Sequence, residues 1–503
     1  MRSKWLNKRR RVREESNKEE ERQSITDLLS TFKKSKDFVQ YHHTGQTECV
    51  ISYIKTLVEP KILSENILND IKNRSLTSLK EIKDHITVQN LFITEDQDMI
   101  QQSLLRGHVM IQMEEEDEQV LFIPADTTET RKVSIPEVEF SVVGPKEAFV
   151  ESLDTNLNLI RQRLPIPELT VDEIVVGKLT KSRVCVLYID GIADDDNINT
   201  VRQRLGDIEF DEIIDSTYIS QMLSDNSNSP FPQFVDTERP DRVVESLAEG
   251  KIAIVVDGSP HALTCPTTLI EFFSSADDYF TTWHLASLIR LLRLFSVAFS
   301  IIATPLYVAI LTYHHDMIPE DLMATIITSR ADIPFPPVLE VIILELAIEL
   351  LREAGARLPT KVGQTIGIVG GIVIGTAAVE AGLTSNVLLI IVALAALASF
   401  TTPIYQIANT VRLIRFPFLL AAQWFGLIGV TMMVCVLIGH LLRLQSLGRP
   451  FLAPIYPMRI SDMKDALFRL PFNKQNVRPL QTRPGVPQRY NSDRMNEKRD
   501  IDE

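Results

Sequence analysis

The sequence predicts an α/β soluble N-terminal region, made of two small α/β subdomains, followed by an α-helical polytopic membrane domain. Charge is the first observation behind this prediction. Of the 503 residues 23% are charged, with a formal net charge of −14, yet nearly all of this charge lies before Arg293 or after Arg443. The second observation is that the segment between these two residues consists mainly of Ile, Leu, Val, Ala and Phe. Soluble portions therefore flank or adjoin one membrane portion.

The same pattern divides the chain into five segments. Seven Lys or Arg residues precede the first acidic residue, and no apolar core of a signal peptide follows them, so we expect an N-terminus that is neither cleaved nor exported. The C-terminal tail is rich in Pro, Arg and Asn, which favours disorder. The expected segments are a disordered charged arm (1–45), a first soluble subdomain with a linking helix (46–164), a second soluble subdomain (165–285), a membrane domain of four to five helices (286–445) and a tail (446–503) that is largely disordered after residue 473.

The first subdomain is predicted from short apolar runs between turn residues. HVMIQM (His108–Met113) and QVLFIPA (Gln119–Ala125) are typical of paired strands, with the acidic EEEDE between them as the tip of a hairpin. A helix is expected over Lys146–Leu164, where apolar residues recur at helical spacing.

The second subdomain repeats this alternation. LTVDEIVVGKL and RVCVLYIDGI are rich in β-branched residues and predict strands, and KIAIVVDGSP predicts another after a helix over Asp241–Ala248. Asp194, Asp195 and Asp196 precede NINTVRQRL, and acidic residues at that place are typical of a helix N-terminus rather than of a metal site.

Neither subdomain carries a pattern typical of catalysis. The sequence contains no GxxxxGK[ST], no HExxH and no GxSxG, and its four cysteines are scattered without CxxC spacing. The pairs His42–His43 and His314–His315 have no further ligands at metal spacing. We therefore expect no enzyme activity, no cofactor, no metal and no nucleic-acid partner.

Three uncharged stretches are long enough to be membrane spans. They are Leu294–Thr312, Val387–Ile404 and Phe416–Leu442. Between the first two lies PPVLEVIILELAIELLREAGARLP, in which Glu345, Glu349 and Glu353 share one helical face. Burying these carboxylates in lipid is expensive, so they must face water, a partner or a pore. An interfacial or re-entrant helix and a tilted span facing a cavity both satisfy this condition.

The segment GQTIGIVGGIVIGTAAVEAGL (Gly363–Leu383) is predicted to be the helix around which the membrane domain is organised. A glycine at every fourth position leaves a bare ridge against which another helix can pack closely. The glycines of this ridge are Gly363, Gly367, Gly371 and Gly375.

The opposite face of this helix allows two interpretations. Its residues are Ile366, Val369, Val373, Thr376 and Glu380. Such a face can simply pack, or it can line a pore in which apolar rings form a gate and Glu380 lies near one mouth. Glu345 and Glu349 are the further candidates for lining a conduction path.

Loop charges give a conflicting topology. They place Arg290/Arg293, Arg357/Lys361 and Arg412/Arg415 on the cytoplasmic side and the acidic loop 313–336 outside. This arrangement requires the glutamate helix to cross, and it puts the basic C-terminal tail outside as well. The number of spans, four or five, therefore stays open.

Four stretches resemble the A subunits of GerA-type spore germination receptors. They are Gly144–Leu164, ILELAIELLREAGARLP (Ile343–Pro359), the glycine helix and RPFLAPIYPMR (Arg449–Arg459). The likeness covers about residues 45–470 in the order of the family. It fits a nutrient receptor subunit and the related stage V sporulation paralogue equally.

The resemblance implies an integral protein of the spore inner membrane, with its N-terminal domain on the spore-core side. It implies a complex with a B-type, transporter-like subunit that binds germinant and with a C-type lipoprotein. It also implies that the A subunit is a homo-oligomer that conducts monovalent cations when germinant binds. The alternative is a non-conducting scaffold on which the transporter-like subunit docks.

Overall fold

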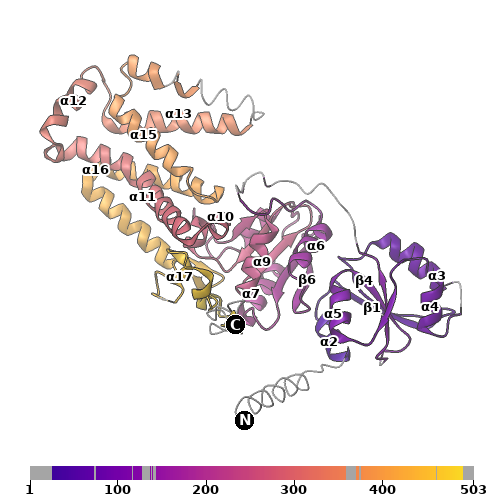
Figure 1. Cartoon of the computed structure of the whole chain (residues 1–503). Helices are drawn as coiled ribbons and strands as arrows, with labels where there is room; N and C mark the ends of the chain where they lie inside the picture. Colours follow the sequence, from indigo (N-terminus) through magenta and orange to yellow (C-terminus); the bar gives the residue numbers. More distant parts are fainter. Residues whose placement is uncertain are drawn as a thin grey trace, which may run out of the picture.

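The computed structural model describes residues 25–72, 75–115, 117–126, 136, 139, 143–357, 370–372, 375–459 and 461–490. Figure 1 shows an N-terminal α/β unit in indigo, a central α/β unit in magenta and a helical lobe in orange, with the yellow C-terminal segment beside the central unit. The predicted fold class is confirmed, because two sheets with helices precede a helical region.

The N-terminal unit is built on a five-stranded antiparallel sheet with strand order β1-β2-β4-β5-β3. In β4, Val109 and Ile111 join the core on one face and Met110 joins the core on the other. A strand covered on both faces reads as a continuous apolar run. The elements are α2 (Ile25–Lys33), β1 (Phe38–His43), β2 (Cys49–Ile54), the π-helix η1 (Ile62–Leu68), α3 (Asn69–Lys72), α4 (Leu79–His85), β3 (Phe92–Thr94), α5 (Gln97–Leu105), β4 (His108–Gln112) and β5 (Val120–Pro124).

The N-terminal unit begins well before residue 46, so the expected disorder is wrong for residues 25–45. Helix α2 buries its apolar face, and β1 pairs with β2 from Phe38 to His43. β1 is an edge strand whose residues are mostly half-buried, and its sequence FVQYHH therefore lacks the apolar run that would reveal it. Residues 1–24 lie outside the described residues.

The central unit is also a five-stranded antiparallel sheet, with strand order β6-β7-β9-β10-β8. Asp194 caps the first helix after β7 by accepting a hydrogen bond from Asp196 N, which is the role expected for these acids. The elements are α6 (Leu153–Arg163), β6 (Leu169–Val176), β7 (Ser182–Ile189), α7 (Asp195–Gly206), α8 (Ser216–Leu223), β8 (Val235–Thr237), α9 (Pro240–Ala248), β9 (Ile252–Val256), β10 (Ala262–Cys265), the 3-10 helix η2 (Leu269–Phe273) and α10 (Asp277–Phe280).

A buried ion pair joins the two α/β units. Arg161 of α6 donates from Nε to Asp37 Oδ2 and from Nη2 to Asp37 Oδ1, both at 2.6 Å, and from Nη2 to Ser35 Oγ at 3.0 Å. Removing one partner of such a pair costs about 3–5 kcal/mol, because the other charge stays buried. The pair therefore fixes the orientation of one unit on the other.

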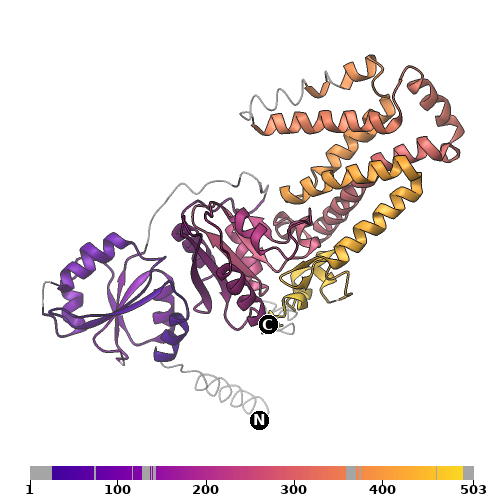
Figure 2. The ribbon, with the colours of Figure 1, turned by 180° about the vertical axis from the view of Figure 1, so that it is seen from behind.

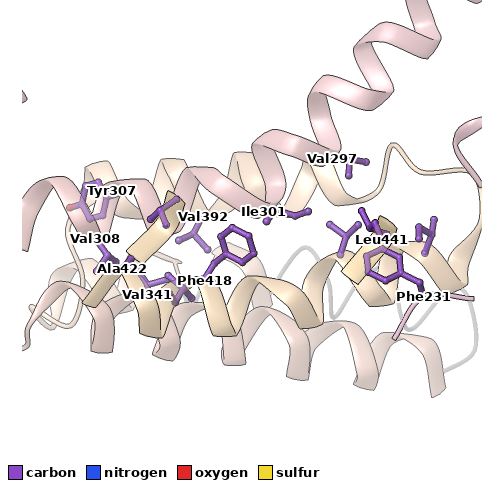
Figure 3. Packing of buried hydrophobic residues seen from close by; sticks show 14 of the residues in the cluster. Phe231, Val297, Ile301, Tyr307, Val308, Val341, Val392, Phe418, Ala422 and Leu441 are labelled. Atoms are coloured by element: carbon purple, nitrogen blue, oxygen red, sulfur yellow. The ribbon is translucent and has the colours of Figure 1, made fainter. Parts of the chain in front are cut away.

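The helical lobe has a bundle of α11, α15 and α16 as its core. Figure 3 shows Val308, Val392 and Phe418 from these three helices filling the space between them. The elements of the lobe are α11 (Trp283–Tyr313), the 3-10 helix η3 (His315–Met317), α12 (Glu320–Arg330), α13 (Pro337–Arg357), α15 (Asn386–Ser399) and α16 (Tyr405–Arg443).

Helix α16 is broken at its middle, so the single span expected over residues 416–442 is wrong. Gly426 has φ 59° and ψ −137°, a conformation that requires glycine and divides α16 into segments 405–425 and 427–443. The two segments cross very closely: a Cβ on Gly429 would lie 2.0 Å from the carbonyl oxygen of Ala421. The break lay hidden in the sequence because both segments are apolar.

Both ends of α16 lie at the central unit. Near its start, Gln406 Nε2 donates to Asp236 Oδ2 at 3.4 Å. Near its end, His440 Nε2 lies 2.9 Å from Ser229 Oγ. The two segments therefore form a hairpin, whose turn lies beside the C-terminal end of α11, where Tyr313 donates to the carbonyl oxygen of Gln423 at 2.9 Å.

The C-terminal segment packs on the central unit, so the expected disorder after residue 473 is wrong for residues 474–490. Arg478 Nε donates to the carbonyl oxygen of Ala248 at 2.7 Å, and Thr482 Oγ1 donates to that of Glu249 at 2.9 Å, both at the end of α9. These polar contacts need no apolar run. The elements are β11 (Gln445–Ser446), β12 (Arg449–Pro450), α17 (Met463–Ala466), and the 3-10 helices η4 (Phe472–Lys474) and η5 (Leu480–Thr482).

The chain thus enters and leaves the helical lobe on the same side, which Figure 2 shows from behind. The C-terminal segment, whose side the sequence left open, therefore lies on the same side of the lobe as the soluble units. The physical reason is the hairpin at Gly426, which adds one passage through the lobe.

Candidate functional site

The candidate site is a set of ion pairs that joins α13 to the rest of the lobe. Arg415 of α16 lies at its centre, with Nη1 at 2.5 Å from Glu345 Oε1 of α13. Its Nη2 donates to Ser300 Oγ of α11 at 2.6 Å and to the carbonyl oxygen of Ala395 of α15 at 3.4 Å. The side chains of Arg415 and Glu345 are 2% and 4% exposed. One guanidinium of α16 therefore contacts three other helices.

Two further glutamates of α13 also pair with arginines from other helices. Arg330 Nη2 of α12 lies 2.8 Å from Glu340 Oε1, and the backbone N–H of Ser385 donates to Glu340 Oε2 at 3.3 Å. Arg412 Nε of α16 lies 3.4 Å from Glu349 Oε1. The predicted acidic face is thus satisfied by arginines within the same chain.

The main effect of these pairs is to specify one arrangement of the helices, and their net contribution to stability is small. An isolated charge at the centre of a bilayer costs about 2.5–3.5 kcal/mol on insertion scales, so each carboxylate needs its partner. A buried ion pair is nevertheless rarely more stable than apolar side chains of the same volume. What the pairs supply is a specific register between α13 and the bundle.

Helix α13 divides into a buried first half and a more exposed second half, which contacts the bundle through Ile348 and through the pair of Glu349 with Arg412. All of its buried residues precede residue 346, and they are Val338, Glu340, Val341, Leu344 and Glu345. Beyond them, Leu346 and Leu350 are 50% and 70% exposed. Glu353 pairs within the helix, at 2.6 Å from Arg357. In Figures 1 and 2 this second half extends away from α11 and α16.

We call the second half of α13 (346–357) and the segment Gly370–Glu380 the arm. Of the residues predicted for this helix, Gly363, Gly367, Ile366, Val369 and Val373 lie outside the described residues. Their packing and pore-lining roles stay predictions.

The described part of the segment Gly370–Glu380 packs through one of the predicted glycines, Gly375, and through one that was not predicted, Gly370. A Cβ on Gly370, which is not on the predicted ridge, would lie 2.6 Å from Leu351 Cδ2 of α13. A Cβ on Gly375 would lie 3.7 Å from Leu389 Cδ2 of α15, whereas a Cβ on Gly371 would have no atom of the described residues within 4 Å. The ridge is thus only partly a contact surface within one chain.

The two polar residues predicted for the opposite face, Thr376 and Glu380, are both exposed. Thr376 Oγ1 donates to the carbonyl oxygen of Ile372 at 2.7 Å within its own helix. The Glu380 carboxylate is therefore presented to the surroundings of the chain, while Glu345 is enclosed.

Sequence reasoning missed the arginines of this site. Arg412 and Arg415 were expected to mark the cytoplasmic end of a span, whereas both are buried in the lobe beside glutamates of α13. The signal that could have found them was the number of glutamates in an apolar helix, because each of these needs a positive partner somewhere in the lobe.

A second charged cluster lies where the lobe meets the central unit. Arg290 Nε of α11 donates to Asp278 Oδ2 at 2.9 Å, and Arg293 also pairs with Asp278. Tyr279 donates to Asp465 Oδ2 of α17 at 2.9 Å, beside a cavity of about 130 Å³. The first basic pair expected as a membrane flank is therefore buried in a junction of α10, α11 and the C-terminal segment.

Glu245, at the edge of this junction, forms no ion pair with a base in the part of the chain that the structure describes. Lys251 Nζ lies 3.1 Å from Glu249 and 2.9 Å from Glu271, which accounts for its charge. Burial, and then the neighbouring carboxylates of Glu249 and Asp465, raise the pKa of Glu245 to about 7. The Glu245 carboxyl therefore binds a proton more readily in the folded protein than in the unfolded chain.

Nothing in the described part of the chain groups three or more His, Cys, Asp or Glu side chains so that they could hold a metal ion. By length and composition, α11 and α16 are long and apolar enough to cross a membrane, with Gly426 dividing α16 into its two segments. Two α/β units joined to a helical lobe with these helices and with internal ion pairs define a membrane-associated protein that has a large soluble region.

Comparison with known proteins identifies the family. Residues 26–481 match the family described as Bacillus/Clostridium GerA spore germination protein. The chain is 50% identical to spore germination protein GerQA of Bacillus cereus over 473 residues, which cover 94% of this chain and 95% of that protein. It is 47% identical to spore germination protein GerIA of Bacillus cereus over 464 residues, which cover 92% of this chain and 69% of that protein. The chain belongs to the GerA spore germination protein family.

A solved structure also matches part of the chain. It is the N-terminal domain of the A subunit of the Bacillus megaterium spore germinant receptor GerK3, with 28% identity and a TM-score of 0.35, and the match covers 48% of this chain and 92% of that one.

Proposed function

We propose that the chain is the membrane subunit of a spore germinant receptor, and that several copies form a cation channel that opens when germinant is sensed. Membership of the GerA family supports the receptor assignment. The observation that carries the channel proposal is the arm, whose Leu346, Leu350 and Ile372 are 50%, 70% and 61% exposed. Copies packed through their arms would cover these side chains and enclose a path between them.

Within such an assembly, the face predicted from the sequence would line the path. Ile366, Val369 and Val373 would form apolar rings that close it by excluding water, and Thr376 and Glu380 would follow towards one mouth. The exposure of Glu380 in the single chain supports this placement, because a ring of carboxylates favours cations over anions.

The proposed location is the spore inner membrane, with the two α/β units on the spore-core side. Because the chain enters and leaves the lobe on one side, it would cross the membrane an even number of times, and the C-terminal segment would share the side of the soluble units. The proposed partners are a B-type, transporter-like subunit that binds germinant and a C-type lipoprotein. The proposal assigns no enzymatic reaction to the chain.

The gate is tested by Val373→Ala in spores that carry the complete receptor. A smaller side chain widens the apolar constriction, so we expect these spores to release potassium and germinate without germinant. Val379→Ala is the matched control, since it makes the same change on another face of the same helix. Val373→Ala spores that stay dormant and keep their potassium would contradict the gate.

The oligomeric state separates the channel from the scaffold. Native mass spectrometry of the purified full-length chain, together with current measurements in a planar bilayer, gives both readouts. We expect an oligomer that passes monovalent cations. A monomer that passes no current would favour a non-conducting scaffold that docks the transporter-like subunit.

A further inference from the structure

The contacts of Arg415 point to a role that the proposed channel leaves open. Its guanidinium is the one place in the described lobe where α11, α13, α15 and α16 share a polar contact. Its three partners come from two parts of the lobe. Ser300 Oγ and the carbonyl oxygen of Ala395 belong to the bundle, whereas Glu345 belongs to α13. Loss of Glu345 would thus leave Arg415 held by two bundle groups.

Glu345 marks the boundary between the buried half and the more exposed half of α13. It is the last buried residue of that helix, and the next residue, Leu346, is 50% exposed. A movement of the arm about this boundary would therefore act on the pair of Glu349 with Arg412 and on the adjoining pair of Glu345 with Arg415. The neighbouring pairs lie on either side, with Glu340 against Arg330 and Glu349 against Arg412.

Two environments can stabilise the charged Glu345 carboxylate. Inside the chain it pairs with Arg415 in an apolar lobe, where an unpaired carboxylate would be costly. Outside the chain it needs water or a cation, which a hydrated path lined by several copies would supply. A buried ion pair of this kind is well suited to a switch, because it specifies an arrangement without adding much stability.

We propose that Arg415 holds Glu345 inside each chain when the channel is closed, and that Glu345 leaves Arg415 for the conduction path when the channel opens. The permeant monovalent cation then takes the place of the guanidinium as the partner of the carboxylate. This inference rests on the proposed channel and adds its regulation. Arg415 is a positioning residue in it, while Glu345 contacts the ion.

The test uses three variants of the full-length chain in potassium-loaded vesicles. Arg415→Gln frees Glu345 and keeps its charge, so we expect the leak without germinant to rise by about tenfold with cation preference retained. Glu345→Gln also breaks the ion pair with Arg415, but it removes the carboxylate, so the leak should rise while cation preference falls. The exchange Glu345→Arg with Arg415→Glu restores the pair and should return the leak to the wild-type level.

Glu353→Gln is the matched control, because Glu353 lies on the same helix and, among the described residues, pairs with the exposed Arg357 of that helix. It should leave the leak unchanged. If Arg415→Gln does not accumulate as folded protein by size-exclusion chromatography, Glu345→Gln and the exchanged pair decide the question, since Glu345→Gln keeps the bundle contacts of Arg415.

Two results would overturn the proposed switching of the Glu345–Arg415 pair while leaving the proposed channel intact. One is a channel that conducts with Val373→Ala but does not leak with Arg415→Gln or Glu345→Gln. The other is equal cation preference in these two leaking variants, which would mean that the pair is structural. Absence of current from every variant, Val373→Ala included, would instead defeat the proposed channel itself.

Discussion

The bundle and the arm both contain large apolar side chains on helices, but the surroundings of these side chains are very different. In the bundle, Leu388, Val392 and Phe418 are fully buried against neighbouring helices. In the arm, Leu350 and Ile372 are 70% and 61% exposed. An apolar helix therefore does not reveal from its composition whether its partner is in the same chain, in lipid or in another copy.

The glycines of the two regions differ in the same way. Gly429 allows the backbones of the two segments of α16 to touch, since an added Cβ would meet the carbonyl oxygen of Ala421. In the arm, Gly370 faces the flexible end of Leu351, and Gly371 faces no atom of the described residues within 4 Å. Glycine spacing thus predicts close packing only where a second backbone is present.

The largest expected effect comes from closing that backbone contact. Gly429→Ala places a methyl group 2.0 Å from the carbonyl oxygen of Ala421, which must move, so we expect a loss of about 3 kcal/mol or more and little folded protein. Gly439→Ala in the same helix is the control, because nothing lies within 4 Å of an added Cβ there. The measurement is thermal unfolding of the full-length chain in detergent. Equal stabilities for the two variants would mean that the segments of α16 do not cross at Gly429.

Much of the fold followed from local patterns in the sequence. Strands covered on both faces, such as β4 and β5, gave continuous apolar runs and were predicted. The edge strand β1 and the C-terminal segment were missed, because half-buried strands and backbone contacts by arginines leave no apolar signature. The hairpin of α16 was missed for the opposite reason, since one apolar run continues through both of its segments.

The candidate site was predictable in one half and not in the other. The glutamates of α13 could be recognised because carboxylates in an apolar helix require an explanation. Their partners could not be found in this way, since Glu345 and Arg415 lie 70 positions apart and only the packing of four helices brings them together. Arg415 was interpreted as the end of a span because each helix was considered separately from the others.

A pair of leucine substitutions measures the difference between bundle and arm directly. Leu388→Ala removes a fully buried side chain of α15 and should lower the free energy of unfolding by about 2–3 kcal/mol. Leu350→Ala should change it by less than about 0.5 kcal/mol, because that side chain is exposed, yet it should weaken the oligomer seen by native mass spectrometry. If both variants lose stability equally, the arm packs within its own chain and the comparison fails.

The bundle also differs from the arm because it meets the central unit at a charged junction. A substitution of Glu245 at the edge of that junction has the smallest expected effect on stability. Because burial raises the Glu245 pKa from 4.5 to about 7, folding favours its protonated form. Its contribution to stability is complete below about pH 4.5 and is lost as the pH rises to about 7. Glu245→Gln should therefore match the wild type at pH 4.5 and be more stable at pH 8 by roughly 1–2 kcal/mol. Unfolding of the full-length chain at both pH values measures this, with the exposed Glu209→Gln as control. A wild-type advantage at pH 8 would show that the Glu245 carboxylate has a base as its partner.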